Sequence, residues 1–361
     1  MALPDDLSSD RESHLEHPCH NVHGYHLLQL PHGRGKVSTG GWIQASPHHR
    51  RLGSLPVDLQ QRIADRVGEF LLFAVTPPRR STSPQRAQEI ADITRKRLEG
   101  LRPDGLVLYD IDDESDRNPT ERPFPFTPTM DPAEYLARYL GELDLPAVVY
   151  RAVGKYDEDD FCGWLAEQDC RSLSVFVGAA SRETPIATTL TRAQSLRAEL
   201  RPDLLLGGVA IPERHTRTGA EHLRLIAKQE AGCSFFVTQV VYDVNAAKDL
   251  VSDYRYECTA RGLVPVPIVF TFSVCGSMKT LEFLKWLGVD VPRWIHNELQ
   301  HADDTLQASF EHARAAALEL MAFCRRLGVP FGLNVESVSI RREEIDASVD
   351  LAAALRPELR R

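Results

Sequence analysis

The sequence lacks an apolar run of about 18 residues, the length that a helix needs to cross a bilayer. It also lacks a basic stretch followed by an apolar one near its N-terminus, so we expect neither membrane spanning nor secretion. Basic residues are outnumbered, with 42 Lys and Arg against 51 Asp and Glu, a net charge of −9 and a pI near 5.8. This balance argues against nucleic acid or an acidic membrane as a partner, because both demand a basic surface. Small molecules are the expected ligands.

Cysteine is sparse, and the seven residues are scattered, mostly inside apolar segments. An odd, dispersed set argues against a disulfide framework and indicates free thiols in a reducing compartment. We therefore expect a cytoplasmic protein. The cysteines are Cys19, Cys162, Cys170, Cys233, Cys258, Cys275 and Cys324.

A dinucleotide-binding G-x-G-x-x-G is also missing after every expected strand, which weakens the case for an open doubly wound sheet. From about residue 68, short apolar runs alternate with longer amphipathic segments, and eight strand-then-helix units can be counted. Strands that are apolar along their whole length are covered on both faces, as parallel strands under helices are. The predicted fold is therefore an α/β class (β/α)8 TIM barrel over residues 68–355. Helices are expected from Ser83 and Asp131, near 157–168, from Thr191, and near 218–231, 245–261, 278–287, 303–326 and 339–355.

Residues 1–60 have little periodicity and are rich in His, Gly, Pro and Ser, so we expect an irregular, His-rich N-terminal extension. Its histidines recur every three residues around Cys19, at positions 14, 17, 20, 23 and 26. Imidazole and thiolate bind zinc, but this spacing does not match the usual structural zinc signatures, and we predict no metal site. The extension could serve as a docking arm, fold over the barrel mouth or form a subunit contact, and the sequence does not distinguish these roles.

Chemistry in such barrels lies at the carboxyl ends of the strands. The segment "IPERH" puts Glu213 and His215 just past the fifth strand, where they could act on a ligand as a pair, bond each other or cap the next helix. In "FFVTQVVYD", Gln239 interrupts an apolar strand, and a buried amide left unpaired costs about 1–3 kcal/mol. Gln239 could therefore hydrogen-bond the edge of a heterocyclic ligand, or it could have a structural role and hydrogen-bond a backbone group. Arg151 and the acidic run "YDIDDESD" also lie at strand ends, where a solvated loop is the commoner explanation for the acidic run.

Residues from about 68 to 355 resemble the methylenetetrahydrofolate reductases. The resemblance is carried by "PERH" with "KQEAG" behind it, by "TQVVYDV", by "VPIVFTFSVCGSMKTLEFLKWLGVDVPRWI" and by "PFGLN". It implies a (β/α)8 barrel that binds flavin and a folate in succession at the strand ends. The implied reaction is reduction of 5,10-methylene- to 5-methyl-tetrahydrofolate, with FAD as cofactor and NADH or NADPH as donor.

The resemblance also implies roles for individual residues. Gln239 matches the glutamine that hydrogen-bonds the folate pterin and is predicted, with Glu213, to be catalytic. Phe283 matches an aromatic residue that packs on the folate, and Lys279 lies in the same folate-binding segment. The positions that contact the flavin nucleotide are matched by His215, Glu221 and Lys228.

Three charged groups of the family are missing. The family reads "FEFFPPR" in its first strand, where a glutamate helps open the methylene bridge, and here that glutamate is Ala74. The Arg-Gly-Asp at the fourth strand end is Val177-Gly178-Ala179 here, and a strand-eight arginine is Val335, with Glu336 beside it.

An alanine transfers no proton, and acid–base assistance is typically worth about 10²–10⁴-fold. Carboxylates or phenols near strand ends that could substitute are Glu213, Tyr109, Asp110, Asp112 and Glu336. Three hypotheses follow. The protein is a reductase with a weakened or absent flavin site and direct use of a nicotinamide, another folate-dependent one-carbon (methyl or methylene) transfer enzyme, or a non-catalytic folate-binding partner subunit. A homo-oligomer stays open.

Overall fold

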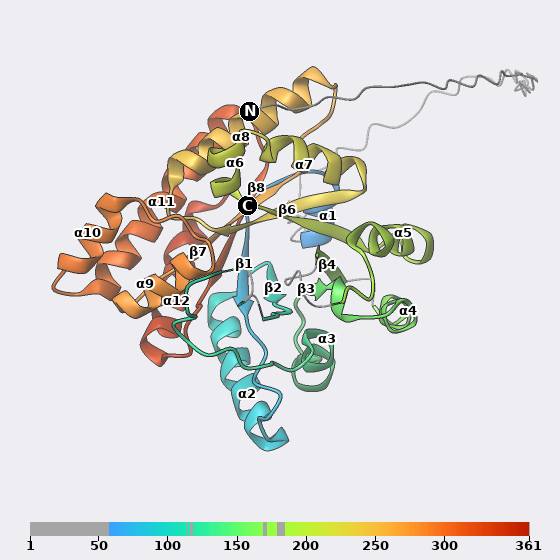
Figure 1. Ribbon diagram of the computed structural model, residues 1–361, viewed down its shortest axis with the longest axis horizontal. Coiled ribbons are helices and arrows are strands. Elements are labelled where there is room, and N and C mark those ends of the chain that lie inside the picture. Colours follow the sequence, from blue (N-terminus) through green and yellow to red (C-terminus); the bar gives the residue numbers. More distant parts are fainter. Residues whose placement is uncertain (1–57, 114, 116–117, 169–171, 179–184, 361) are drawn as a thin grey trace, which may run out of the picture. The chain divides into compact units, whose positions relative to one another are not determined.

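The computed structural model describes residues 58–360, except 114, 116–117, 169–171 and 179–184. Eight parallel strands pair in chain order and close into a barrel, with β8 returning to pair with β1 (Figure 1). The predicted (β/α)8 barrel is therefore confirmed. The expected irregular extension with its histidines lies outside the described residues up to residue 57, but its last two residues were predicted wrongly, because they begin a helix. The strands are β1 (Phe70–Val75), β2 (Gly105–Leu108), β3 (Ala147–Ala152), β4 (Ser172–Val177), β5 (Leu205–Ala210), β6 (Cys233–Val240), β7 (Ile268–Ser273) and β8 (Phe331–Glu336).

Helices fill the connections between the strands and surround the barrel. Several begin where a side chain satisfies a free backbone N–H: Ser83 accepts from Arg86 N, and Asp131 accepts from Ala133 N, as expected for capping residues. The α-helices are α1 (Leu59–Ala64), α2 (Pro84–Leu101), α3 (Pro132–Tyr135), α4 (Glu158–Glu167), α5 (Leu190–Leu200), α6 (Pro212–Thr218), α7 (Glu221–Glu230), α8 (Val244–Ala260), α9 (Met278–Trp286), α10 (Arg293–His301), α11 (Thr305–Leu327) and α12 (Arg342–Leu355). Shorter turns are η2 (Leu136–Leu140), η3 (Val153–Lys155) and η4 (Arg356–Glu358).

Three of these helices, α1, α6 and α10, were not expected from the sequence. Helix α6 begins at Pro212, directly after β5, so "PERH" is the first turn of a helix and not a loop. A proline at the first helical position suits a helix start, because its missing N–H would be unbonded there anyway. Helix α10 is short and buries only Ile295 and Leu299, four residues apart, which is a weak periodic pattern.

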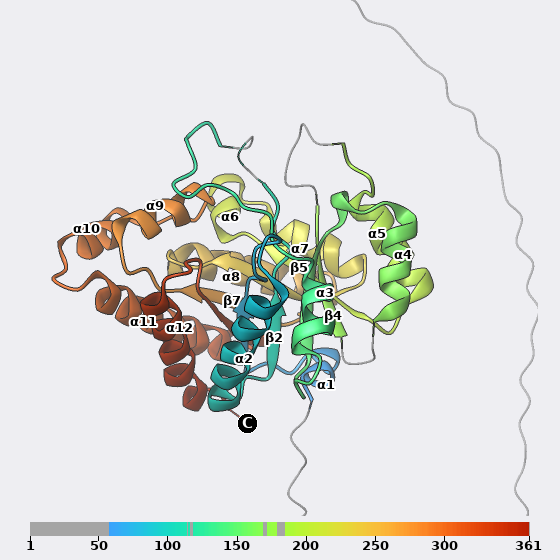
Figure 2. The ribbon, with the colours of Figure 1, turned by 90° about the horizontal axis from the view of Figure 1, so that it is seen from below.

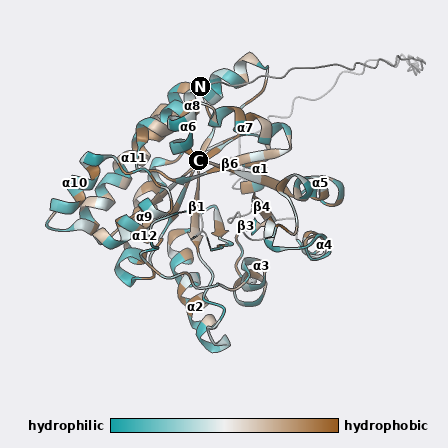
Figure 3. Cartoon of the chain, viewed as in Figure 1, coloured by the Kyte–Doolittle hydropathy of each residue, from teal (hydrophilic) through white to brown (hydrophobic). Residues whose placement is uncertain are grey.

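Apolar side chains fill the barrel interior and the layer between strands and helices, and in Figure 3 the helices carry both brown and teal residues, as amphipathic helices do. Helix α1 closes the end of the barrel where the strands begin, with Leu59 and Ile63 inside the interior core. A β-carbon at Gly105 would lie 2.7 Å from Leu59 Cδ2, so a larger residue there would force the Leu59 side chain to move. The opposite end, where the strands finish, is left for polar residues.

Five cysteines lie in the described part of the chain, and all five are free, as expected. Within the same residues, no helix is both long and apolar enough to cross a membrane.

Candidate functional site at the barrel mouth

We call the end of the barrel where the strands finish the mouth. Side chains alternate along a strand, so residues two apart share a face. The interior core contains Leu72, Val148 and Val237, and the same face of each strand continues from these residues to the mouth. The inward-facing residues nearest the mouth are Ala74, Tyr109, Tyr150, Val177, Val209, Gln239, Ser273 and Glu336.

Glu336 ends β8 close to Tyr109 and Tyr150. Burial raises the pKa of its carboxyl to about 7, while a hydrogen bond with the Tyr109 hydroxyl acts in the opposite direction. That hydroxyl also accepts from Asn334 Nδ2 at 2.9 Å, and the Tyr109 and Tyr150 rings meet edge to face at 4.8 Å. A carboxyl with such a pKa is partly protonated at neutral pH, so it can donate a proton.

Ala74, which replaces the family's first-strand glutamate, lies beside Glu336. Strand β1 pairs with β8 in the register Leu72 to Asn334 and Phe73 to Val335. The next step along both strands puts Ala74 next to Glu336, with neighbouring strands about 4.8 Å apart. A carboxyl is therefore present at the mouth, one strand away from the position that the family motif predicts.

Gln239 and Glu213 meet at one turn, residues 287–290, between α9 and α10. The Gln239 Nε2 donates to the Leu287 carbonyl at 2.6 Å, and Glu213 accepts from the Asp290 backbone N–H. Burial raises the pKa of Glu213 to about 7, and the Asp290 charge also raises it. Glu213 Oε2 has no hydrogen-bond partner among the described residues. The turn thus brings together the two residues predicted to be catalytic.

Phe283 and Lys279 lie on α9, under the connection between β2 and α3, which is on the same side of the barrel as α6 and α9 (Figure 2). The Phe283 ring meets Phe124 edge to face at 5.4 Å and stacks on Trp286 at 6.2 Å. The Lys279 Nζ lies 4.7 Å from the Phe124 ring centre. An aromatic wall with a cation beside it suits a flat, anionic ligand.

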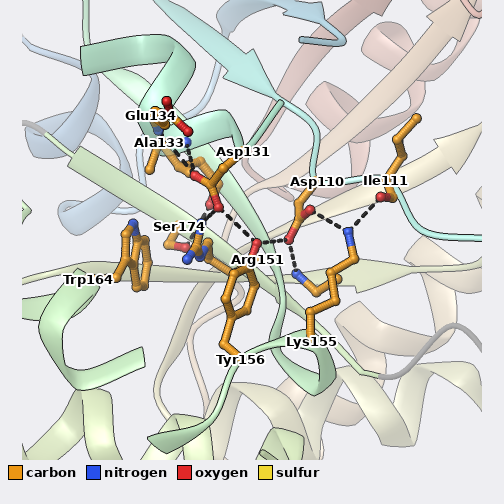
Figure 4. A network of polar contacts seen from close by, with 12 residues as sticks. Asp110, Ile111, Asp131, Ala133, Glu134, Arg151, Lys155, Tyr156, Trp164 and Ser174 are labelled. Carbon is orange, nitrogen blue, oxygen red and sulfur yellow. Dashed lines mark hydrogen bonds and ion pairs between the residues drawn. The ribbon is translucent and has the colours of Figure 1, made fainter. Parts of the chain in front are cut away.

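Asp110 and Arg151 belong to a polar network outside the barrel interior (Figure 4). Lys155 Nζ and the Tyr156 hydroxyl donate to Asp110 at 2.7 and 3.0 Å. Arg151 donates to Asp131 at 2.6 Å, and its guanidinium lies 3.8 Å from the Tyr156 ring centre. These groups satisfy one another, so the network fixes η3 and α3, and Asp110 is less suited to proton transfer than Glu336.

The remaining strand-end positions are mostly structural. Asp112 accepts from the next residue's N–H in an irregular connection. Val177 packs against the interior core, whereas Ala179 lies outside the described residues. Val335 is fully buried in the layer between strands and helices, so the missing strand-eight arginine is replaced by a core residue.

Two residues matched to flavin contacts are engaged within the protein. Glu221 is fully buried, and its carboxylate accepts from Arg214 at 3.0 Å. The Lys228 ammonium donates to the Val209 carbonyl, and burial lowers the pKa of Lys228.

His215, the third such residue, pairs with Asp253 of α8 at 3.1 Å. Glu213 and His215 do not act as a pair, because residues two apart on a helix differ by about 200° in direction. One faces the turn at Asp290, and the other faces α8.

Sequence reasoning missed Tyr150 and Asn334. Each looks like an ordinary strand residue in an apolar run, and only the closed sheet brings them to Glu336 and Tyr109. An asparagine inside the apolar run "FGLNV" is the one hint that the sequence offers.

Fold and site define a (β/α)8 barrel protein with a polar mouth suited to a flat organic ligand. A model of the methylenetetrahydrofolate reductase family matches residues 185–334. A solved structure described as an uncharacterized protein from Clostridium thermocellum that binds two copies of 5-methyl-5,6,7,8-tetrahydrofolic acid is 42% identical, with a TM-score of 0.74 over 83% of this chain and 99% of that chain. The chain belongs to the methylenetetrahydrofolate reductase family.

Two further solved structures that match the chain are much less similar to it in sequence. A dihydropteroate synthase from Xanthomonas albilineans is 15% identical over 81% of this chain and 94% of that chain, with a TM-score of 0.41. A GH113 β-1,4-mannanase is 11% identical over 81% of this chain and 99% of that chain, with a TM-score of 0.44. No curated protein matches the chain.

Proposed function

We propose that this protein reduces 5,10-methylene- to 5-methyl-tetrahydrofolate, with a nicotinamide cofactor as direct hydride donor and Glu336 as proton donor. The observation that carries the proposal is the similarity to the Clostridium thermocellum protein, because the compound that protein binds is the product of this reaction. Family membership and the partly protonated carboxyl at the mouth support it further.

In the proposed reaction, Glu336 gives a proton to N10 of the folate as the bond between the methylene carbon and N10 breaks. The resulting N5-iminium carbon then accepts a hydride from the nicotinamide and becomes the N5-methyl group. The products are 5-methyltetrahydrofolate and the oxidised nicotinamide, and solvent returns the proton to Glu336. A carboxyl with a pKa of about 7 can both give and regain this proton at neutral pH.

We assign Gln239 to the pterin ring. Its side chain is half-buried, and Leu287 is its one hydrogen-bond partner among the described residues. The amide therefore keeps its oxygen and a second N–H for a ligand. Phe283 would pack on the folate, and Lys279 would attract its carboxylates, on the same side of the mouth.

Replacing Gln239 by Leu tests this assignment. The change keeps the volume roughly but removes both hydrogen-bonding functions, so we expect 5-methyltetrahydrofolate to bind about 5- to 150-fold more weakly, equivalent to about 1–3 kcal/mol. Calorimetric titration of folded variant and wild type measures this. An unchanged Kd would return Gln239 to a structural role at Leu287.

The residues matched to flavin contacts do not suit a flavin as they are arranged. Glu221 is satisfied by Arg214, Lys228 by the Val209 carbonyl, and His215 by Asp253. A flavin would have to displace these internal contacts, so no step of the proposed reaction passes through one. This favours direct hydride transfer from the nicotinamide.

We therefore expect purified full-length protein to be colourless and to oxidise NADH or NADPH only when methylenetetrahydrofolate is present. The assay follows nicotinamide absorbance, with and without added FAD, and identifies 5-methyltetrahydrofolate by chromatography. Stimulation by FAD of about tenfold or more would favour a flavin-dependent reductase instead.

A second candidate function is methyl or methylene transfer, because a protein that binds 5-methyltetrahydrofolate can also use it as a donor. The same experiment separates the two. Tight folate binding without nicotinamide oxidation would favour transfer or a non-catalytic folate-binding subunit.

A further inference from the structure

Three helices bring two imidazoles and a carboxylate together outside the barrel mouth. His215 comes from α6, His222 from α7 and Asp253 from α8, and one ligand atom of each lies within 4.8 Å of the others. The His215 Nε2 is 3.1 Å from Asp253 Oδ2, and the two imidazole rings meet edge to face at 5.3 Å. We infer that these three residues form a binding site for a divalent transition metal such as Zn²⁺.

The chemistry of the three ligands suits zinc. Zinc binds imidazole nitrogen and carboxylate oxygen at about 2.0–2.2 Å, so two ligands of one tetrahedral ion lie about 3.3 Å apart. The separation of His215 and Asp253 is already close to this value. Two imidazoles argue against Mg²⁺ and Ca²⁺, which prefer oxygen ligands.

The surroundings of the cluster also suit a metal. His215 is 5% exposed, and the Nδ1 atoms of His215 and His222 are buried without a hydrogen-bond partner among the described residues. Such orphaned nitrogens are costly, and a metal bound through the His222 Nδ1 would give that nitrogen a partner. The Asp253 side chain is 54% exposed, which leaves the ion a path from solvent and room for water in the fourth position.

A metal at this site would fasten α6 to α7 and α8. Because Glu213 lies on α6 two residues before His215, the ion would also hold the helix that presents Glu213 to the turn at Asp290. The site does not depend on the proposed reaction, so it can be tested without an activity assay.

The test is the melting temperature of the full-length, metal-stripped protein as ZnCl₂ is added. Binding to the folded state alone should raise Tm by about 5 °C at a zinc concentration about 100-fold above Kd. The His222→Ala variant should lose most of this rise, because His222 is only half-buried and its loss removes a ligand with little damage to the core. Asp253→Asn keeps a hydrogen-bonding side chain beside His215 but removes the ligand charge, and should also lose most of it.

His301→Ala, an exposed histidine on α10, is the matched control and should keep the full rise. No zinc-dependent rise in wild type would overturn the inference and leave the cluster as an internal hydrogen bond. A full rise that persists in both His222→Ala and Asp253→Asn would overturn it too, and would place the zinc elsewhere, with the N-terminal histidines as the first place to look.

Discussion

Replacing Glu336 by Gln should lower kcat/KM for methylenetetrahydrofolate reduction about 10²–10⁴-fold, because the amide keeps the shape of the side chain but cannot donate an acidic proton. Folate binding should change little, since the proton is needed in the transition state and not for binding. Steady-state kinetics and calorimetric titration of the same preparation measure the two quantities separately.

The matched variant for this test is Glu213→Gln. Glu213 has a similar pKa and one oxygen without a hydrogen-bond partner in the described part of the chain, but it is held at the turn that Gln239 also contacts. We expect a loss of about tenfold, the effect of a disturbed turn, and clearly smaller than for Glu336→Gln. If the order of the two losses were reversed, Glu213 would be the proton donor.

The pH dependence of kcat/KM should also reflect Glu336 as the proton donor. Because the reaction needs protonated Glu336, kcat/KM should fall about tenfold per pH unit above pH 7, and Glu336→Gln should abolish this decline.

The stability of the fold should also decrease as pH rises. The pKa of the carboxyl is near its ordinary value of 4.5 in the unfolded chain and about 7 in the folded one, so the free energy of unfolding decreases as pH rises through this window. Urea unfolding at pH 5 and pH 8 should show a smaller difference in the Glu336→Gln variant.

The barrel could be predicted from the sequence because each strand is a continuous apolar run followed by an amphipathic segment. Eight such units permit few other arrangements. The capping residues Ser83 and Asp131 even located two helix starts correctly. Helix α6 was missed because its seven residues follow β5 without a turn signal.

The site was harder to predict, because its geometry depends on pairing between residues far apart in the chain. Glu336 was one of five candidate acids, and only the register of β1 with β8 distinguishes it by placing it beside Ala74. His215 and Glu213 are neighbours in sequence but point to different partners, which a strand-end interpretation could not reveal.

The proximity of Ala74 and Glu336 allows the carboxyl to be moved between strands. In a Glu336→Gln background, Ala74→Glu should restore about 10- to 100-fold of the lost turnover, because the new carboxyl enters the mouth about 4.8 Å away, on β1. In the wild-type background the same change should not help. Two adjacent buried carboxyls raise each other's pKa, so we expect Ala74→Glu alone to destabilise the fold by about 1–3 kcal/mol.

The control for this exchange is Ala74→Gln with Glu336→Gln, which adds the same volume without a carboxyl. It should stay as inactive as Glu336→Gln alone. Any recovery of turnover in the Ala74→Glu double variant is then due to the new carboxyl and not to the added side-chain volume. Circular dichroism and urea unfolding of all four variants check that each is folded. If Ala74→Glu raised turnover in the wild-type background as much as in the Glu336→Gln background, Glu336 would not be the working acid. The protein would then be a reductase that lost its proton donor and did not replace it.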